Sequence, residues 1–231
     1  MTVAAFDAET TGGTLKPGAR GAVYLSNGIY TCVWTGSAWE YYHAGQRAYR
    51  PKDSDFAWLN QSTSTVDTSS GGIYLLQPSA ATQYLAIRKR AAPATPYTVT
   101  VKIQPNLFPS VQNIGVGMLI GNGTAQHTFG VVIIASNGFN VITEKWTSPS
   151  VWSAIYTSVA YDNMGWQTLW MRMQDNGTNR ICSLSVDGYN FRVLHTVART
   201  DFLTGTEIGF YAKAQNGAEA AGVMLVSWQV T

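Results

Sequence analysis

The fold is decided by residues 169–188, which read LWMRMQDNGTNRICSLSVDG. Here Leu169, Met171 and Met173 fall on every second position, with Trp170 and Arg172 between them. This is the two-residue period of a half-buried strand. The pairs Asn176-Gly177 and Asp187-Gly188 supply the positive φ angles that tight hairpin turns require. The stretch therefore predicts strands over residues 167–175 and 179–186, joined as an antiparallel hairpin.

The same pattern extends outward over most of the chain. Further strands are predicted near residues 55–60, 72–77, 83–88, 96–104, 112–120, 126–134, 138–145, 190–197, 206–213 and 221–230. No segment of useful length has a helical period, although Asp201-Phe202-Leu203 suits one helical turn. Many short strands with Gly-rich turns predict an all-β sandwich or barrel.

The front of the chain has a different organisation. Residues 1–14 predict a flexible lead, and residues 15–51 predict a small β-meander with a hairpin turn at Asn27-Gly28. A sheet of this size needs something to pack against. Because Pro51-Lys52-Asp53-Ser54 interrupts the pattern, we expect an attachment segment over residues 1–52 and a larger β domain over residues 53–231.

Composition limits the partners of this protein. Only 12% of the 231 residues are charged and the net charge is +2, so we expect no nucleic-acid partner. We expect no membrane insertion, because no apolar run is long enough to span a bilayer. No apolar segment follows Met1, so we expect no signal peptide. In a reducing compartment, Cys32 and Cys182 are then expected to be free thiols.

A more specific likeness comes from residues spread over the second half of the chain. They are the two hairpin turns named above, the motif Asp201-Phe202-Leu203, the strand Ile208-Gly209-Phe210-Tyr211 and the closing Leu225-Val226-Ser227-Trp228. Together with the opening strand at residues 55–61, this pattern resembles the concanavalin-A-like (laminin-G-like) jelly-roll domains of bacteriophage tail and receptor-binding proteins. The resemblance covers about residues 55–231 and implies an antiparallel β-sandwich.

The acidic residues do not match the glycosidases that share this jelly roll. Those enzymes place carboxylates two residues apart on one strand, whereas Glu144 has Ile142 and Trp146 as its neighbours on the same face. The histidines His43, His127 and His195 lack metal-ligand spacing. Residues 175–179 favour a side-chain-capped turn over a calcium loop. We therefore expect no enzyme, no metal and no cofactor.

An aromatic stretch remains as the candidate ligand site. Sugars are bound by aromatic rings that cover their apolar faces and by polar side chains that bond their hydroxyls. The candidate ligand-binding residues are Glu144, Trp146, Trp152, Tyr156 and Tyr161. The alternative for Trp146 is packing within the sheet.

These observations lead to one functional hypothesis and two alternatives. The hypothesis is a non-enzymatic phage virion protein that displays a lectin-like domain on the virion surface, binds a glycan of a cell surface or matrix, and contacts other virion proteins through residues 1–52. The resemblance also implies a homo-oligomer, with a trimer usual for phage fibres. The alternatives are a capsid decoration or tail protein that binds no sugar, and a polysaccharide-degrading enzyme.

Overall fold

The computed structural model divides into two compact units, residues 1–50 and 51–231. The structure describes residues 50–79, 84–108, 113–134, 138–161, 168–215 and 219–231, and the backbone of four strands in the first unit. These four strands form one antiparallel sheet in the order β1 (Arg20–Leu25), β2 (Gly28–Trp34), β3 (Trp39–His43) and β4 (Gln46–Ala48). The predicted flexible lead, residues 1–14, lies outside the described residues.

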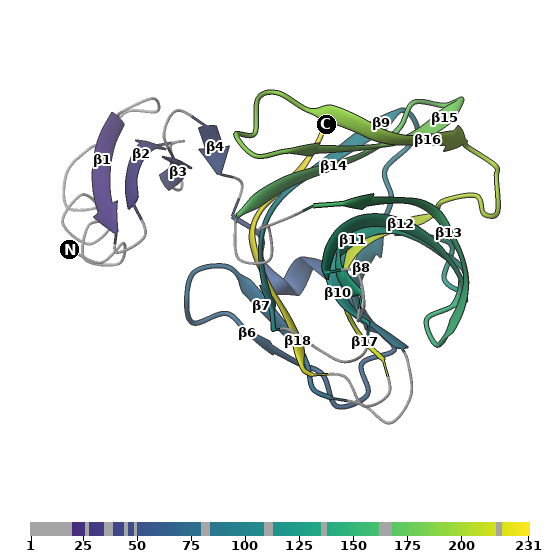
Figure 1. The fold of residues 1–231 in the computed structure, drawn as a ribbon. Coiled ribbons are helices and arrows are strands. Elements are labelled where there is room, and N and C mark those ends of the chain that lie inside the picture. The colour runs from purple at the N-terminus through teal and green to yellow at the C-terminus, as the bar shows by residue number, and fades with distance from the viewer. Residues whose placement is uncertain are drawn as a thin grey trace. The chain divides into compact units, whose positions relative to one another are not determined.

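The second unit is a sandwich of two seven-stranded antiparallel sheets, which confirms the predicted fold class (Figure 1). In order across it, the first sheet contains β13 (Val151–Ala160), β12 (Gly138–Ser148), β11 (Gln126–Ile134), β10 (Ile114–Gly121), β17 (Glu207–Ala214), β8 (Tyr84–Ala91) and β5 (Ala57–Leu59). The second contains β16 (Arg192–Ala198), β15 (Asn179–Ser185), β14 (Leu169–Asp175), β9 (Tyr97–Leu107), β18 (Ala221–Val230), β7 (Ile73–Gln77) and β6 (Thr65–Asp67).

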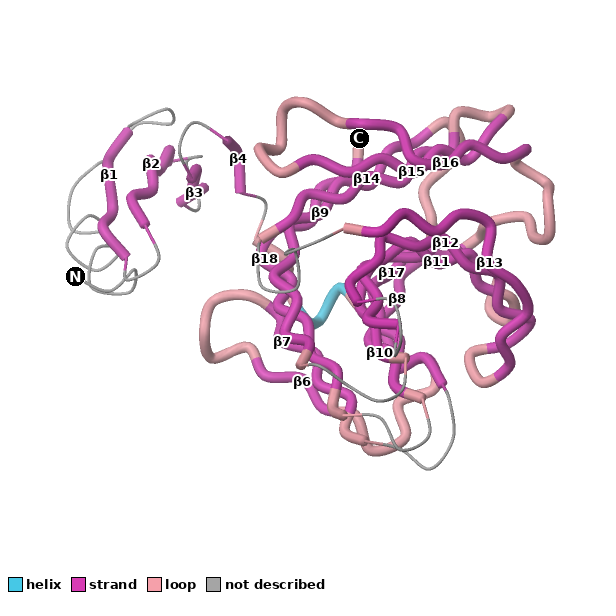
Figure 2. Tube along the Cα trace, in the orientation of Figure 1, coloured by secondary structure: helices cyan, strands magenta, loops and turns pink. Residues whose placement is uncertain are grey.

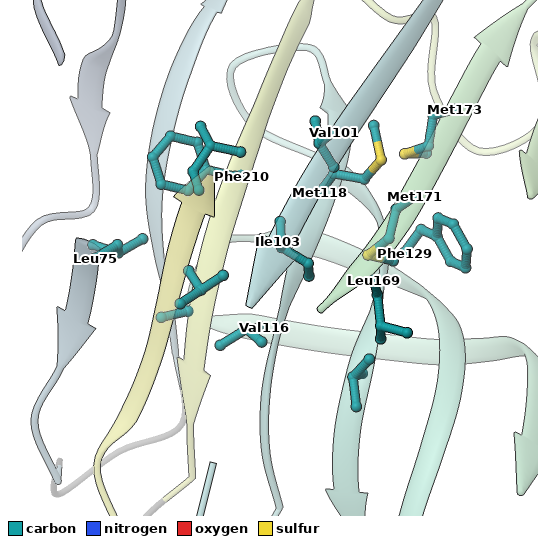
Figure 3. Close-up of a cluster of buried hydrophobic side chains, with 14 of the residues drawn as sticks. Leu75, Val101, Ile103, Val116, Met118, Phe129, Leu169, Met171, Met173 and Phe210 are labelled. Atoms are coloured by element: carbon teal, nitrogen blue, oxygen red, sulfur yellow. The ribbon is translucent and has the colours of Figure 1, made fainter. Parts of the chain in front are cut away.

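The main hydrophobic core lies between the two sheets. Leu169, Met171 and Met173 of β14 are all fully buried, as their alternation predicts. They face Met118 and Phe129 from the first sheet (Figure 3). Burying such side chains stabilises the fold by about 1.5–3 kcal/mol each relative to exposure. This core therefore fixes which face of each sheet points inward, and hence which residues remain for the outer faces.

The turn between β14 and β15 is capped as the sequence predicts. The Asn176 side-chain oxygen accepts hydrogen bonds from the backbone N–H groups of Thr178 (2.9 Å) and Asn179 (2.7 Å). Gly177 has a φ of +92°, which glycine adopts without a Cβ penalty. These side-chain contacts explain the polar residues of the turn.

Some local predictions differ from the structure. Residues 151–160 form the strand β13, where the sequence suggested only an aromatic stretch, and the short strand β6 was also not predicted. Residues 201–203 form no helical turn, because Phe202 has a φ of +66° that breaks the helical conformation. The described helix is a single 3₁₀ turn, Asp53–Asp55. In the described part of the chain, no helix is long and apolar enough to cross a membrane.

The first sheet curls strongly, so that its face turned away from the second sheet is concave (Figures 1 and 2). Three register shifts interrupt the pairing of β12 with β13 and bend this hairpin. Its tip reaches across the concave face, where the Leu85 N–H of β8 donates a 2.7 Å hydrogen bond to the Pro149 carbonyl. The hairpin thus covers part of the concave face.

Candidate functional site

The concave face carries aromatic and polar side chains in rows that run across the strands. In one row, Trp152 of β13 is paired with Trp146 of β12, and Trp146 with Gln126 of β11. Paired residues of antiparallel strands lie on the same face of the sheet. Trp146 and Gln126 are fully buried, whereas Trp152 is 44% exposed. The row therefore leads from a buried interior to an exposed aromatic ring.

A buried ion pair lies next to this row. The Lys213 Nζ of β17 donates to both carboxylate oxygens of Glu144, at 3.0 and 2.9 Å. The Trp146 indole N–H donates to the Glu144 Oε2 at 3.3 Å, and the Lys213 Nζ lies 5.6 Å from the centre of the Trp146 ring. The side chains of Lys213 and Glu144 are only 2% and 5% exposed. This network fixes the orientation of the Trp146 ring.

Glycines make room for these long side chains on the concave face. A Cβ on Gly130 would lie 2.2 Å from the Tyr211 hydroxyl oxygen and 2.4 Å from the Val116 carbonyl oxygen. A Cβ on Gly115 would lie 3.4 Å from the Lys213 Cε. The 2.2 Å contact is too close for a side chain, so glycine at position 130 allows Tyr211 to lie across the strands, whereas the 3.4 Å contact with Lys213 is only close packing.

An apolar cluster separate from the main core supports the site. It consists of Leu85, Ile87, Leu119, Trp146 and Tyr211. Burial raises the pKa of the Tyr211 hydroxyl well above its ordinary value, and the nearby Glu144 carboxylate raises it further. Tyr211 is therefore a neutral side chain at physiological pH.

The structure separates the five residues that the sequence suggested. Glu144, Trp146 and Trp152 lie together on the concave face. Tyr156 instead faces the second sheet, where its ring contacts those of His127 (4.9 Å between centres) and His195 (4.7 Å). Tyr161 packs against the main core. The predicted residues thus occupy two different faces of the first sheet.

Sequence reasoning missed the residues of this site that come from distant strands. Lys213 and Tyr211 belong to β17 and stand among buried residues, whereas Gln126 begins β11 after the half-buried Ala125. Their signal was a polar residue within a strand flanked by apolar ones, such as Lys213 between Ala212 and Ala214. A buried charge requires a partner, but the sequence does not indicate which one.

Two carboxylates of the first sheet, Glu144 and Glu207, are each paired with a lysine. Both oxygens of Glu144 are engaged by Lys213, and Glu207 is paired with Lys89. A retaining glycosidase requires two carboxyl groups about 5 Å apart, one of which donates a proton. Within the described ranges, no group of three or more His, Cys, Asp or Glu residues is arranged to hold a metal ion.

Solved structures with the same fold place the sandwich among lectin-like jelly rolls. No protein-family model matches the chain, and no curated protein matches it either. A protein of unknown function from Saccharomyces cerevisiae is similar with a TM-score of 0.56 and 16% identity, over 78% of this chain and 98% of that one. The Lotus tetragonolobus seed lectin has a TM-score of 0.52 and 12% identity, over 79% and 95% of the two chains.

A glycoside hydrolase structure is also similar. The GH43 protein BlXynB from Bacillus licheniformis has a TM-score of 0.55 and 11% identity, over 91% of this chain and 52% of that one. At such identities the likeness shows the fold alone. The second unit therefore has a concanavalin-A-like, lectin-type fold.

Proposed function

We propose that the sandwich is a non-catalytic carbohydrate-binding domain that takes its ligand on the concave face, beside Trp152. The observation that carries the proposal is the row of Trp152, Trp146 and Gln126, which combines an exposed aromatic ring with buried polar groups. The Gln126 Oε1 is buried and has no hydrogen-bond partner among the described residues. Because Gln126 and Trp146 have no exposed surface, the Trp152 ring is the part of the row that a sugar can cover with its apolar face.

A glycan-array screen with the full chain tests this proposal. We expect saturable binding, and we expect Trp152→Ala to weaken it at least tenfold, or about 1.4 kcal/mol. The matched control is Tyr189→Ala, because Tyr189 is a 64% exposed aromatic residue in the turn between β15 and β16 of the other sheet. Equal glycan binding by the Trp152→Ala and Tyr189→Ala proteins would contradict a binding site at Trp152.

The absence of catalysis is part of the proposal and has its own test. Its support is that Glu144, the carboxylate beside Trp146, accepts hydrogen bonds from Lys213 and from the Trp146 indole. We expect no release of reducing ends from any polysaccharide that the protein binds. Release that is lost in a Glu144→Gln variant would instead identify a polysaccharide-degrading enzyme.

We also propose that the chain is a bacteriophage virion protein, with residues 1–52 as the attachment segment and the sandwich displayed on the virion surface. This rests on the resemblance of the hairpin turns and of the closing strand to phage receptor-binding domains. Full-length protein mixed with purified particles of a matching phage is expected to bind at a fixed stoichiometry, and residues 53–231 alone are expected to remain unbound. Binding of both proteins, or of neither, would contradict the role of residues 1–52.

The exposed edge of the first sheet favours a second candidate function, a decoration or tail protein without sugar binding. Charged residues and proline commonly protect an edge strand from pairing with another chain. The edge strand β13 contains neither. Val151 is 54% and Ile155 47% exposed there. Under this alternative, Trp152→Ala disrupts subunit association, measured by light scattering, while the array shows no binding by the native protein.

A further inference from the structure

A second polar cluster lies between the two sheets, away from the concave face. It comprises Lys145, His127, Tyr156, Arg180, His195 and Asp201. Five strands of the two sheets supply one of these residues each, and Asp201 follows β16. Because β13 and β16 are the edge strands of their sheets, the cluster lies along one edge of the sandwich.

The cluster contains a fully buried cation, Arg180, with which no carboxylate of the described residues forms an ion pair. The Arg180 side chain is 0% exposed, and its Nη2 donates to the backbone carbonyl of Asp201. The Asp201 carboxylate accepts from the Tyr156 hydroxyl and lies 3.1 Å from the Lys145 Nζ. The next carboxylate along the sandwich, Asp175, is already paired with Arg199 at 2.9 Å. Asp201 thus balances one of the two cations, and one positive charge remains.

The unpaired atoms of the cluster are all nitrogens. Among the described residues, the Arg180 Nε and Nη1, both ring nitrogens of His127 and the Nε2 of His195 are buried and have no hydrogen-bond partner. The His195 Nδ1 is held 2.9 Å from the Thr157 hydroxyl. The two histidine rings lie 5.8 Å apart between centres, with an edge-to-face orientation. A neutral histidine ring offers one of its two nitrogens as an N–H donor, so both histidines can donate alongside Arg180. These donors and the surplus positive charge match a ligand that only accepts hydrogen bonds.

We propose that Arg180, His127 and His195 bind a small monovalent anion of the halide class, such as chloride, between the two sheets. The ion supplies the missing counter-charge of Arg180 and accepts the unused N–H groups, which otherwise remain unpaired in a buried environment. A halide is a single small ion, so it can lie between buried nitrogen atoms where a larger anion would not fit. Because it contacts strands of both sheets, it stabilises the edge at which β13 lies. This site is independent of the proposed glycan site.

The histidines give the site a readout that a purely structural cluster lacks. Burial lowers the pKa of His195, and repulsion by Arg180 and Lys145 lowers it further, against the opposing effect of Asp201. Burial also lowers the pKa of His127 well below its ordinary value, and the charges of Arg180, His195 and Lys145 lower it further. A bound anion offsets the repulsion. The pKa of His195, followed by NMR, is therefore expected to rise when chloride replaces a bulky anion.

The test compares the full-length protein in sodium chloride and in sodium gluconate at the same ionic strength. If the dissociation constant is about 1 mM, then about 100 mM chloride raises the Tm by roughly 5–10 °C over gluconate. Arg180→Gln is expected to abolish this difference. The matched control, Arg172→Gln, is expected to retain it, because Arg172 lies on β14 and donates to Thr100.

Two further measurements decide the matter if Arg180→Gln does not fold. His195→Gln, which changes a half-buried residue, is expected to reduce the chloride effect on Tm. Crystals soaked in bromide are expected to show an anomalous peak between Arg180 and the two histidines. A Tm, a His195 pKa and a diffraction map that do not depend on the halide would overturn the proposal and indicate that water alone fills the cluster.

Discussion

The ion pair between Lys213 and Glu144 gives the sharpest test of the concave face. In a Lys213→Met protein, the side chain keeps its approximate length but the ammonium is lost, and Glu144 retains only the Trp146 indole as a donor, at 3.3 Å. Both partners are at most 5% exposed, so water cannot replace the lost contact. Removing one partner of a buried pair costs about 3–5 kcal/mol. For a chain of this size, that corresponds to a Tm lower by roughly 6–20 °C.

The assay is thermal and urea unfolding, followed by circular dichroism and by Trp fluorescence. The control is Lys89→Met, because Lys89 and Glu207 form a pair whose side chains are 23% and 20% exposed. That substitution is expected to cost about 1 kcal/mol or less. A double variant, Glu144→Leu with Lys213→Met, is expected to recover most of the loss, since no unpaired charge remains. A Lys213→Met protein as stable as Lys89→Met would refute the reasoning.

Three other predictions concern glycine, tyrosine and cysteine. Gly130→Ala is expected to lower the urea midpoint of unfolding far more than Gly138→Ala. A Cβ at position 130 would lie 2.2 Å from the Tyr211 hydroxyl oxygen. Gly138 has a φ of +68°, but no atom lies within 4 Å of a Cβ at that position. Burial raises the pKa of the Tyr97 hydroxyl from 10 to about 12. The contribution of neutral Tyr97 to folding stability is therefore complete below pH 10 and is lost as the pH rises toward 12. A Tyr97→Phe protein should lose less stability over that interval, as measured by unfolding at each pH. Burial also raises the pKa of the free Cys182 thiol to about 12, so iodoacetamide is expected to modify it only after unfolding, as checked by peptide mass mapping.

The sequence predicted most of the sandwich because its signals are local. Alternation in Leu169, Met171 and Met173 indicates a strand with one buried face, and a following Asn-Gly pair indicates where the strand turns. Each strand predicted between residues 55 and 231 has a counterpart in the structure. Such patterns state which face of a strand is apolar. They do not state which strand lies next to it.

The strand β13 was missed for a physical reason. Its residues, VWSAIYTSVA, combine exposed and half-buried positions, because one edge of the strand is unpaired and the bulges of the hairpin shift its register. Trp152 therefore reaches the concave face, while Tyr156 reaches the space between the sheets. Closeness in sequence suggested one cluster, but bulged strands distribute neighbouring aromatic residues over both faces.

The scaffold alone does not separate a lectin from a hydrolase, since both the Lotus lectin and the GH43 protein contain structures similar to this sandwich. The match covers only 52% of the GH43 protein's chain, so the function of this sandwich has to be inferred from its own side chains. Here the acidic residues Glu144 and Glu207 are each neutralised by a lysine, Lys213 and Lys89. If the concave face binds a glycan as proposed, these pairs leave aromatic and amide groups to contact it, which favours a neutral sugar over a charged one. If the array instead selects acidic glycans, an exposed cationic surface elsewhere on the sandwich has to bind them.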